Sequence, residues 1–312
     1  MTNPIDDIVP RKLESGLENI LHKFSFAIED LVNFGSNVLK WDIENSSLKD
    51  EELPALLFLR NFIEQIDAIS ILIKASSIEP CKSLLRTSLE NIFYIEYLLE
   101  QSNYNRAMSF LYWYRLNEKQ KLKKRDGISD EYNRLANKFS KDKLLNNCSP
   151  PTIEGVDKLL TYSDSILNSE KYQLFKVEYE RTKLKLKNNI TWYSLFDGPK
   201  NIFELAERLN RHALYEELFK QFSFSTHGTD ILKGKIKSNN LKNYGVSQIR
   251  NPMEAQNITK NCLNFCFIVF DIFIKHRIPT KQNDLNNLYL GLKSFNNELS
   301  QKEFIKVKKN DS

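Results

Sequence analysis

The feature that most constrains this fold is the recurrence of apolar side chains three and four residues apart over long stretches. That spacing lines one face of an α-helix. The chain has only 9 glycines and 9 prolines in 312 residues, so few positions interrupt a helix. Hydrophobic residues make up 41% of it, which is enough for a substantial core. These properties predict an all-α fold, a multi-helix bundle with no significant sheet.

The periodicity and its interruptions also predict where the helices lie. The expected helices cover about 10–41, 50–75, 81–100, 104–125, 129–145, 152–167, 169–187, 201–224, 253–276 and 283–297. The helix at 50–75 is apolar on most sides, so we expect it to lie centrally, with Glu64 and Asp67 near the core. The polar stretch 42–50 and the basic, asparagine-rich stretch 233–244 are predicted to be loops.

Residues 128–189 differ in composition from the chain on either side. Apolar residues become sparse there, and lysine, asparagine and glutamate dominate. We therefore predict a peripheral helical insertion at 128–189, between the two halves of a helical core at 1–127 and 190–276. A surface helix and a frayed tail are expected at 277–312.

Charge and cysteine content narrow the functional classes. The net charge of +5 permits contact with nucleic acid without implying it. The four cysteines form no CxxC pair, so no metal site or cofactor is expected, and buried thiols suit a reducing cytosol. The most apolar run, 262–274, is shorter than a membrane span, so we expect a core helix, a cytoplasmic location and no membrane partner.

Common catalytic signatures are absent from the sequence, which contains no GxxxxGK[ST], GxSxG or HExxH. Arg86 and Glu90 are the first candidates, because a spacing of four places both on one helix face among apolar neighbours. They form either an ion pair that orients packing or an anion-binding arginine that its glutamate positions.

His227 is the second candidate, and it precedes a glycine where a helix is expected to end. It either caps that helix or acts as a general acid or base. Ser225 and Thr226 place hydroxyl groups beside it. Arg208 and His212 are expected to share a helix face, most simply as a solvated pair and otherwise as part of a binding site.

Two stretches resemble the bacterial domain of unknown function family 5677. The first is Arg86-Thr-Ser-Leu-Glu90 with the aromatic residues that follow, and the second runs from Trp192-Tyr-Ser to Ser225-Thr-His-Gly228. The resemblance implies an all-helical domain in which an arginine, a glutamate and a Ser/Thr-His-Gly segment converge. Such domains are similar in style to helical HEPN-type ribonucleases, many of which act in antiviral defence or toxin systems. The HEPN signature, Arg-x4–6-His, is not met, because only three residues separate Arg208 from His212.

Two functions follow as hypotheses. The first is a binding, sensor or effector component of a defence or toxin-type system, which binds a small anionic ligand or a protein partner. Assembly into a homo-oligomer is an alternative that the sequence leaves open. The second is a metal-independent, HEPN-like ribonuclease in which His227 is the base, Arg86 stabilises the phosphorane and Glu90 orients Arg86. The basic segments Lys119–Arg125 and Lys233–Lys242 would then hold the RNA backbone.

Overall fold

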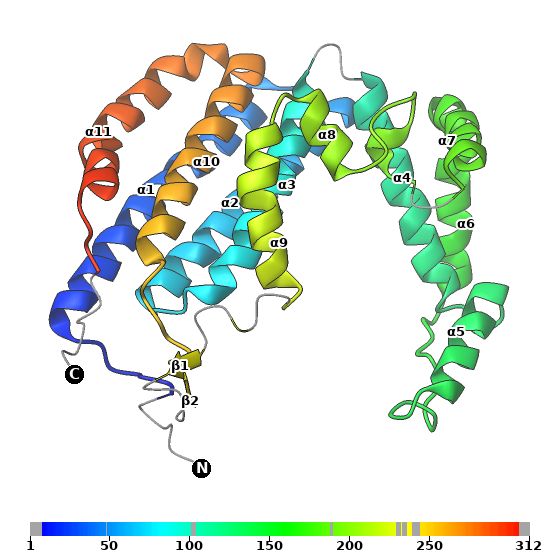
Figure 1. The fold of residues 1–312 in the computed structure, drawn as a ribbon. Coiled ribbons are helices and arrows are strands. Elements are labelled where there is room, and N and C mark those ends of the chain that lie inside the picture. Colours follow the sequence, from blue (N-terminus) through cyan, green and yellow to red (C-terminus); the bar gives the residue numbers. More distant parts are fainter. Residues whose placement is uncertain are drawn as a thin grey trace. The chain divides into compact units, whose positions relative to one another are not determined.

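A computed structural model describes residues 8–47, 49–100, 104–187, 190–228, 232, 236–238 and 244–305. The chain divides into two compact units (Figure 1). Unit 1 comprises residues 1–102 and 206–312, and unit 2 comprises residues 103–205. The predicted insertion at 128–189 lies within unit 2, which also takes in the helix before it and the aromatic connector after it.

Unit 1 is a bundle of helices that come from both ends of the chain. Its elements are α1 (Ser15–Asn45), η1 (Asp50–Glu52), α2 (Leu53–Lys74), α3 (Glu79–Leu99), the π-helix η4 (Leu214–Phe219), α9 (Lys220–Thr226), β1 (Ile236–Ser238), β2 (Tyr244–Val246), α10 (Ala255–Arg277), η5 (Pro279–Lys281) and α11 (Gln282–Gln301). Helix α3 lies against α2, α10 and α9, while α11 covers the outer side of α10 (Figure 1). The all-α prediction is confirmed.

The core of unit 1 consists of aromatic and aliphatic side chains from these helices. Its fully buried phenylalanines are Phe24, Phe62, Phe93, Phe265, Phe270 and Phe273. Helix α1 approaches its neighbours closely at Gly35, where an added Cβ would lie 2.9 Å from Ile63 and 3.0 Å from Phe270. Burial of this apolar surface is the main stabilising contribution to the bundle.

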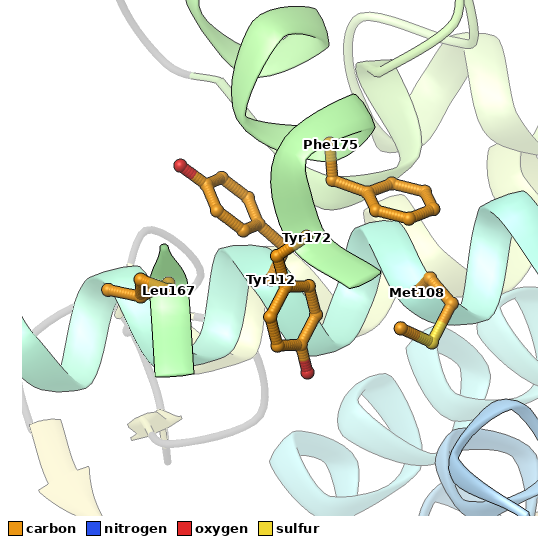
Figure 2. Packing of buried hydrophobic residues seen from close by; sticks show 5 residues of the cluster. All are labelled: Met108, Tyr112, Leu167, Tyr172 and Phe175. Carbon is orange, nitrogen blue, oxygen red and sulfur yellow. The ribbon is translucent and has the colours of Figure 1, made fainter. Parts of the chain in front are cut away.

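Unit 2 has a separate small core. Its elements are α4 (Tyr104–Lys123), α5 (Asp130–Lys141), α6 (Val156–Leu167), η2 (Glu170–Tyr172), α7 (Gln173–Leu186), η3 (Trp192–Ser194) and the first part of α8 (Ile202–Arg208). Figure 2 shows Met108 and Tyr112 of α4 packed near Leu167, Tyr172 and Phe175. The thinning of apolar residues along this stretch matches a core that is smaller than that of unit 1.

Four expectations about local structure are wrong. Helix α1 continues to Asn45 through the predicted loop, and Asp42 is only 1% exposed. The predicted loop at 233–244 includes parts of a short antiparallel pair, β1 with β2. Helix α2 has a solvent face, so Glu64 and Asp67 are exposed and Glu64 pairs with Arg60.

The fourth is the single helix expected over 201–224, which is divided into α8, η4 and α9. The interruption follows Arg208, and Asn210 there has a φ of 55°. Asparagine tolerates this left-handed conformation better than most residues, because its short side chain can hydrogen-bond locally. The helical spacing continued through this point in the sequence, so periodicity alone did not reveal the break.

Helix α10 contains the apolar run that was predicted to be a core helix. Among the described helices it is the one whose length and composition would allow it to cross a membrane. Most of its apolar positions are buried within unit 1, against α3, α1 and α11. A buried core helix meets the same criteria of length and hydropathy.

Candidate functional site

Arg86 and Glu90 lie on one face of α3, as their spacing predicted. Pro80 stands in the first turn of this helix, where its missing N–H costs nothing. The Arg86 Nη2 and Glu90 Oε1 atoms are 3.1 Å apart, and about three-quarters of each side chain is buried, with 23% and 25% exposed. Burial raises the pKa of the Glu90 carboxyl, and the positive charge of Arg86 only partly offsets that effect.

The π-helix η4 contacts the arginine of this ion pair through Phe219. The Arg86 guanidinium carbon lies 4.8 Å from the centre of the Phe219 ring, and that ring also packs near Phe93. The Arg86 Nε atom is buried and donates to no described acceptor. Arg86 therefore holds η4 against α3 through a cation–π contact, while its charge is balanced by Glu90.

His227 does not join this pair. It is exposed at the C-cap of α9, and among the described residues its side chain has no hydrogen-bond or ion-pair partner. The next residue inward, Thr226, lies 3.2 Å from Ser83 through their hydroxyl oxygens. Because Phe219 contacts Arg86 and Thr226 contacts Ser83, α9 runs antiparallel to α3 and His227 points beyond Ser83. His227 thus follows a residue that lies beside the first part of α3, on the N-terminal side of Arg86, whereas Glu90 lies one turn beyond Arg86 in the other direction.

The Thr226 hydroxyl group beside His227 contacts α3 and the backbone of its own helix, α9. Thr226 also donates to the carbonyl oxygen of Phe222 at 2.9 Å, and Ser225 is half-buried on the same turn. Gly228, with a φ of 66°, ends the helix in the left-handed conformation that glycine favours. This segment therefore has the geometry of a helix C-terminus docked on α3.

Arg208 and His212 do not share a helix face, contrary to the prediction, because the break at Asn210 separates them. Arg208 lies 3.4 Å from Glu100 and stacks over the Tyr97 ring. His212 is exposed on the other side of the break.

The sequence analysis missed a stronger pair beside them. Arg211 donates through Nε and Nη2 to the two carboxylate oxygens of Glu96, both at 2.9 Å. This two-pronged geometry is the most favourable one for an arginine and a carboxylate. The two residues are 115 positions apart in the chain, so no local spacing could have indicated the pair.

A polar cavity of about 310 Å³ lies between α3, α9 and the start of α10. Lys82 lines it and is 12% exposed, with its amine 2.7 Å from Glu254 and 3.0 Å from Glu79. Burial is the strongest influence on Lys82 and disfavours its charge, but the hydrogen bonds to Glu254 and Glu79 outweigh it and raise the pKa of the amine. Lys82 is therefore a cation held in place by two carboxylates.

The remaining polar side chains that line this cavity have no partner among the residues that the structure describes. Gln221, Asn257, Lys260 and Asn261 line it, and none of their side chains has a hydrogen-bond or ion-pair partner among the described residues. Leu218, Phe222 and Ile258 provide the apolar part of the wall. Three amides and a free ammonium group around a cavity of this size can bind a small polar molecule. The sequence showed no sign of it, because the residues come from separate helices.

The structure describes all of one of the two basic segments proposed to hold RNA, and only a small part of the other. Segment Lys119–Arg125 lies at the end of α4 and just beyond it, and three of its lysines form ion pairs, with Glu118, Glu131 and Asp164. Of Lys233–Lys242, only residues 236–238 fall within the described part of the chain. The first segment is thus largely neutralised by its own neighbours.

Cysteines and metal ligands offer no further site in the described part of the chain. No group of three or more histidine, cysteine, aspartate or glutamate side chains is arranged there to hold a metal ion. Cys81, Cys262 and Cys266 are buried and free, and burial raises the pKa of Cys81 to about 12. Thiols of this kind stay protonated and do not act as nucleophiles.

Comparison with known proteins identifies one family. The model of a family described as "Family of unknown function (DUF5677)" matches residues 52–243. The match runs from the start of α2 to beyond α9, and so includes Arg86, Glu90 and His227. No curated protein and no solved structure matches the chain.

Proposed function

The chain belongs to the DUF5677 family, and from that premise we propose that unit 1 is a binding module for a small anionic ligand. The observation that carries this proposal is the cavity of about 310 Å³ whose amides and free lysine have no described partner in the protein. Lys260 and Asn261 are half-buried, whereas Gln221 and Asn257 are exposed at the mouth of the cavity. Because none of the four is engaged by a described residue, all four can hydrogen-bond to a ligand.

The charges around the cavity favour an anion. Lys82 is balanced by Glu79 and Glu254, whereas Lys260 has no carboxylate partner among the described residues. A carboxylate or phosphate group placed beside Lys260 would receive a charge-assisted hydrogen bond and further donors from Asn257, Asn261 or Gln221. The ligand class is therefore a small carboxylate or phosphate monoester.

Isothermal titration with inorganic phosphate and with succinate, on the full chain, tests the proposal. A hydrogen bond to a charged group contributes about 1.5–3 kcal/mol, so Lys260→Met should weaken binding roughly 10- to 150-fold. The matched control is Lys275→Met on the same helix, because Lys275 is exposed and pairs with Asp271 outside the cavity. If neither anion binds, or if both variants bind as tightly as the wild type, the proposal is wrong.

The ribonuclease alternative has weaker support from the geometry. Its arginine is already paired with Glu90 and contacts the Phe219 ring, and its histidine is exposed at the C-terminal end of α9 with no described contact to that pair. Expression of the wild type, His227→Ala and Arg86→Ala, followed by measurement of growth and RNA integrity, tests it directly. RNA breakdown that both substitutions abolish would favour the nuclease over the binding module. The same expression series tests a role in a defence or toxin-type system.

A further inference from the structure

We infer that unit 1 contains a second binding site, between α10 and α11, for a planar heteroaromatic molecule with N–H donors, of the nucleobase class. The site is a cavity of about 440 Å³ that shares no lining residue with the cavity at Lys82. It therefore does not depend on the anion-binding proposal. Its volume falls in the range of small-molecule pockets.

One wall of this cavity is aromatic. The rings of Phe267 and Tyr289 meet edge to face, with centres 5.3 Å apart and planes at 79°. Tyr289 is 44% exposed although it borders apolar side chains of both helices. An aromatic ring that is held by one neighbour and open on the cavity side is suited to stack against a flat ligand.

One acceptor atom among the lining residues has no hydrogen-bond donor in the described part of the chain. The Gln282 Oε1 atom is buried and accepts no hydrogen bond from any described residue, while its Nε2 atom donates to Asp271 at 3.3 Å. That contact fixes the orientation of the amide and leaves its carbonyl oxygen unpaired. A buried acceptor without a donor is unfavourable, so a ligand N–H that pairs with it would favour binding. Asn286, also in the lining, adds a donor and an acceptor without a described partner.

The charges at this cavity argue against an anionic ligand. Arg211 is engaged at two of its nitrogens by Glu96, and the Asp271 carboxylate is held by Lys275 and Gln282. No lysine is among the described residues that line the cavity. An uncharged ring with donors and acceptors along one edge satisfies the free amide groups, and nucleobases have this form.

Titration of the full chain with adenosine, guanosine, cytidine and uridine tests the inference, with ribose as the probe that lacks a base. We expect at least one nucleoside to bind and ribose not to bind. Tyr289→Ala should weaken that binding at least about fivefold, whereas Tyr289→Phe should retain it, because stacking on an aromatic ring contributes at this level. Gln282→Met, which keeps the size of the side chain but removes the acceptor, should weaken it by a similar factor.

The matched control is Leu290→Ala, a neighbouring position on α11 that is 63% exposed and outside the cavity lining. It should bind as the wild type does. Binding of no nucleoside, or equal binding by wild type, Tyr289→Ala and Gln282→Met, would overturn the inference. Phosphate binding and its loss in Lys260→Met are measured separately, so failure of one site is distinguishable from failure of the other.

Discussion

Replacement of Arg86 by methionine tests whether this arginine stabilises the fold or acts in catalysis. Loss of one partner from a fully buried ion pair costs about 3–5 kcal/mol. The Arg86–Glu90 pair is about one-quarter exposed, so solvent screening reduces that cost, whereas loss of the contact with Phe219 adds about 0.5–1 kcal/mol. We expect Arg86→Met to lower the free energy of unfolding by about 2–3 kcal/mol at pH 7.

The pH dependence of this loss is the sharper test. Burial already raises the pKa of Glu90, and removal of Arg86 removes the charge that opposes this rise. In the variant, folded Glu90 therefore binds a proton more readily than unfolded Glu90, so the unfolding free energy increases as the pH falls. The part of the loss that comes from the unpaired Glu90 charge is complete above the raised pKa of Glu90 and diminishes as the pH falls toward the ordinary value of about 4.3, while the loss of the Phe219 contact remains. The stability deficit should thus be smaller at pH 5 than at pH 7.

Urea unfolding followed by circular dichroism at both pH values measures these differences. The matched control is Arg60→Met, because Arg60 and Glu64 form a pair of the same spacing on α2 but are 62% and 58% exposed. An exposed pair of this kind contributes about 0.3–0.5 kcal/mol. The double variant Arg86→Met/Glu90→Gln should recover part of the loss, since no carboxylate is left without its cation. A deficit that is equal at both pH values, or no recovery in the double variant, would refute this account of Arg86.

Three further substitutions test the packing of the two units, one in unit 2 and two in unit 1. In unit 2, Glu178 accepts hydrogen bonds from Arg181, from Thr182 and from the backbone N–H of Phe196, and the Arg181 contact is the main reason that its pKa is lowered. Glu178→Gln should therefore destabilise unit 2 by about 1–3 kcal/mol at pH 7. The difference should shrink as the pH falls below about 4.3, where the unfolded carboxyl takes up a proton, toward the lowered pKa of the folded carboxyl. In unit 1, Gly35→Ala should cost about 1–3 kcal/mol, because its Cβ would lie 2.9 Å from Ile63. Gly291→Ala, with open space around it, should stabilise α11 by about 0.5–1 kcal/mol, and similar thermal midpoints for the two glycine variants would contradict this account.

The regular helices were predictable because their cause is local. Apolar spacing and the scarcity of glycine and proline located most helices, including the core helix that became α10. The same local character made the Arg86–Glu90 pair visible, since both residues lie on one helix one turn apart. Periodicity failed where a single residue changed the backbone, as at Asn210, because the apolar pattern continues across that break.

The candidate sites were not predictable for a different reason. The cavity at Lys82 combines side chains of α3, α9 and α10, and the cavity at Tyr289 combines α10 with α11. Sequence reasoning grouped Arg86, Glu90 and His227 by their chemical types, but the antiparallel packing of α9 on α3 carries His227 past the ion pair. Which side chains meet depends on the direction and offset of packed helices, and these are properties of the whole core.

By itself, the sequence determined that this chain forms helices, nearly where each of them lies, and which side of each is apolar, because these properties depend on neighbours within a few residues. Only the tertiary structure decided that Asp42 meets Arg277 at 2.9 Å and that Glu96 meets Arg211 at the same distance. These contacts join residues that are 235 and 115 positions apart. They form because the apolar faces can be buried together only in one arrangement of the helices, and that arrangement brings the polar residues at the helix edges into contact.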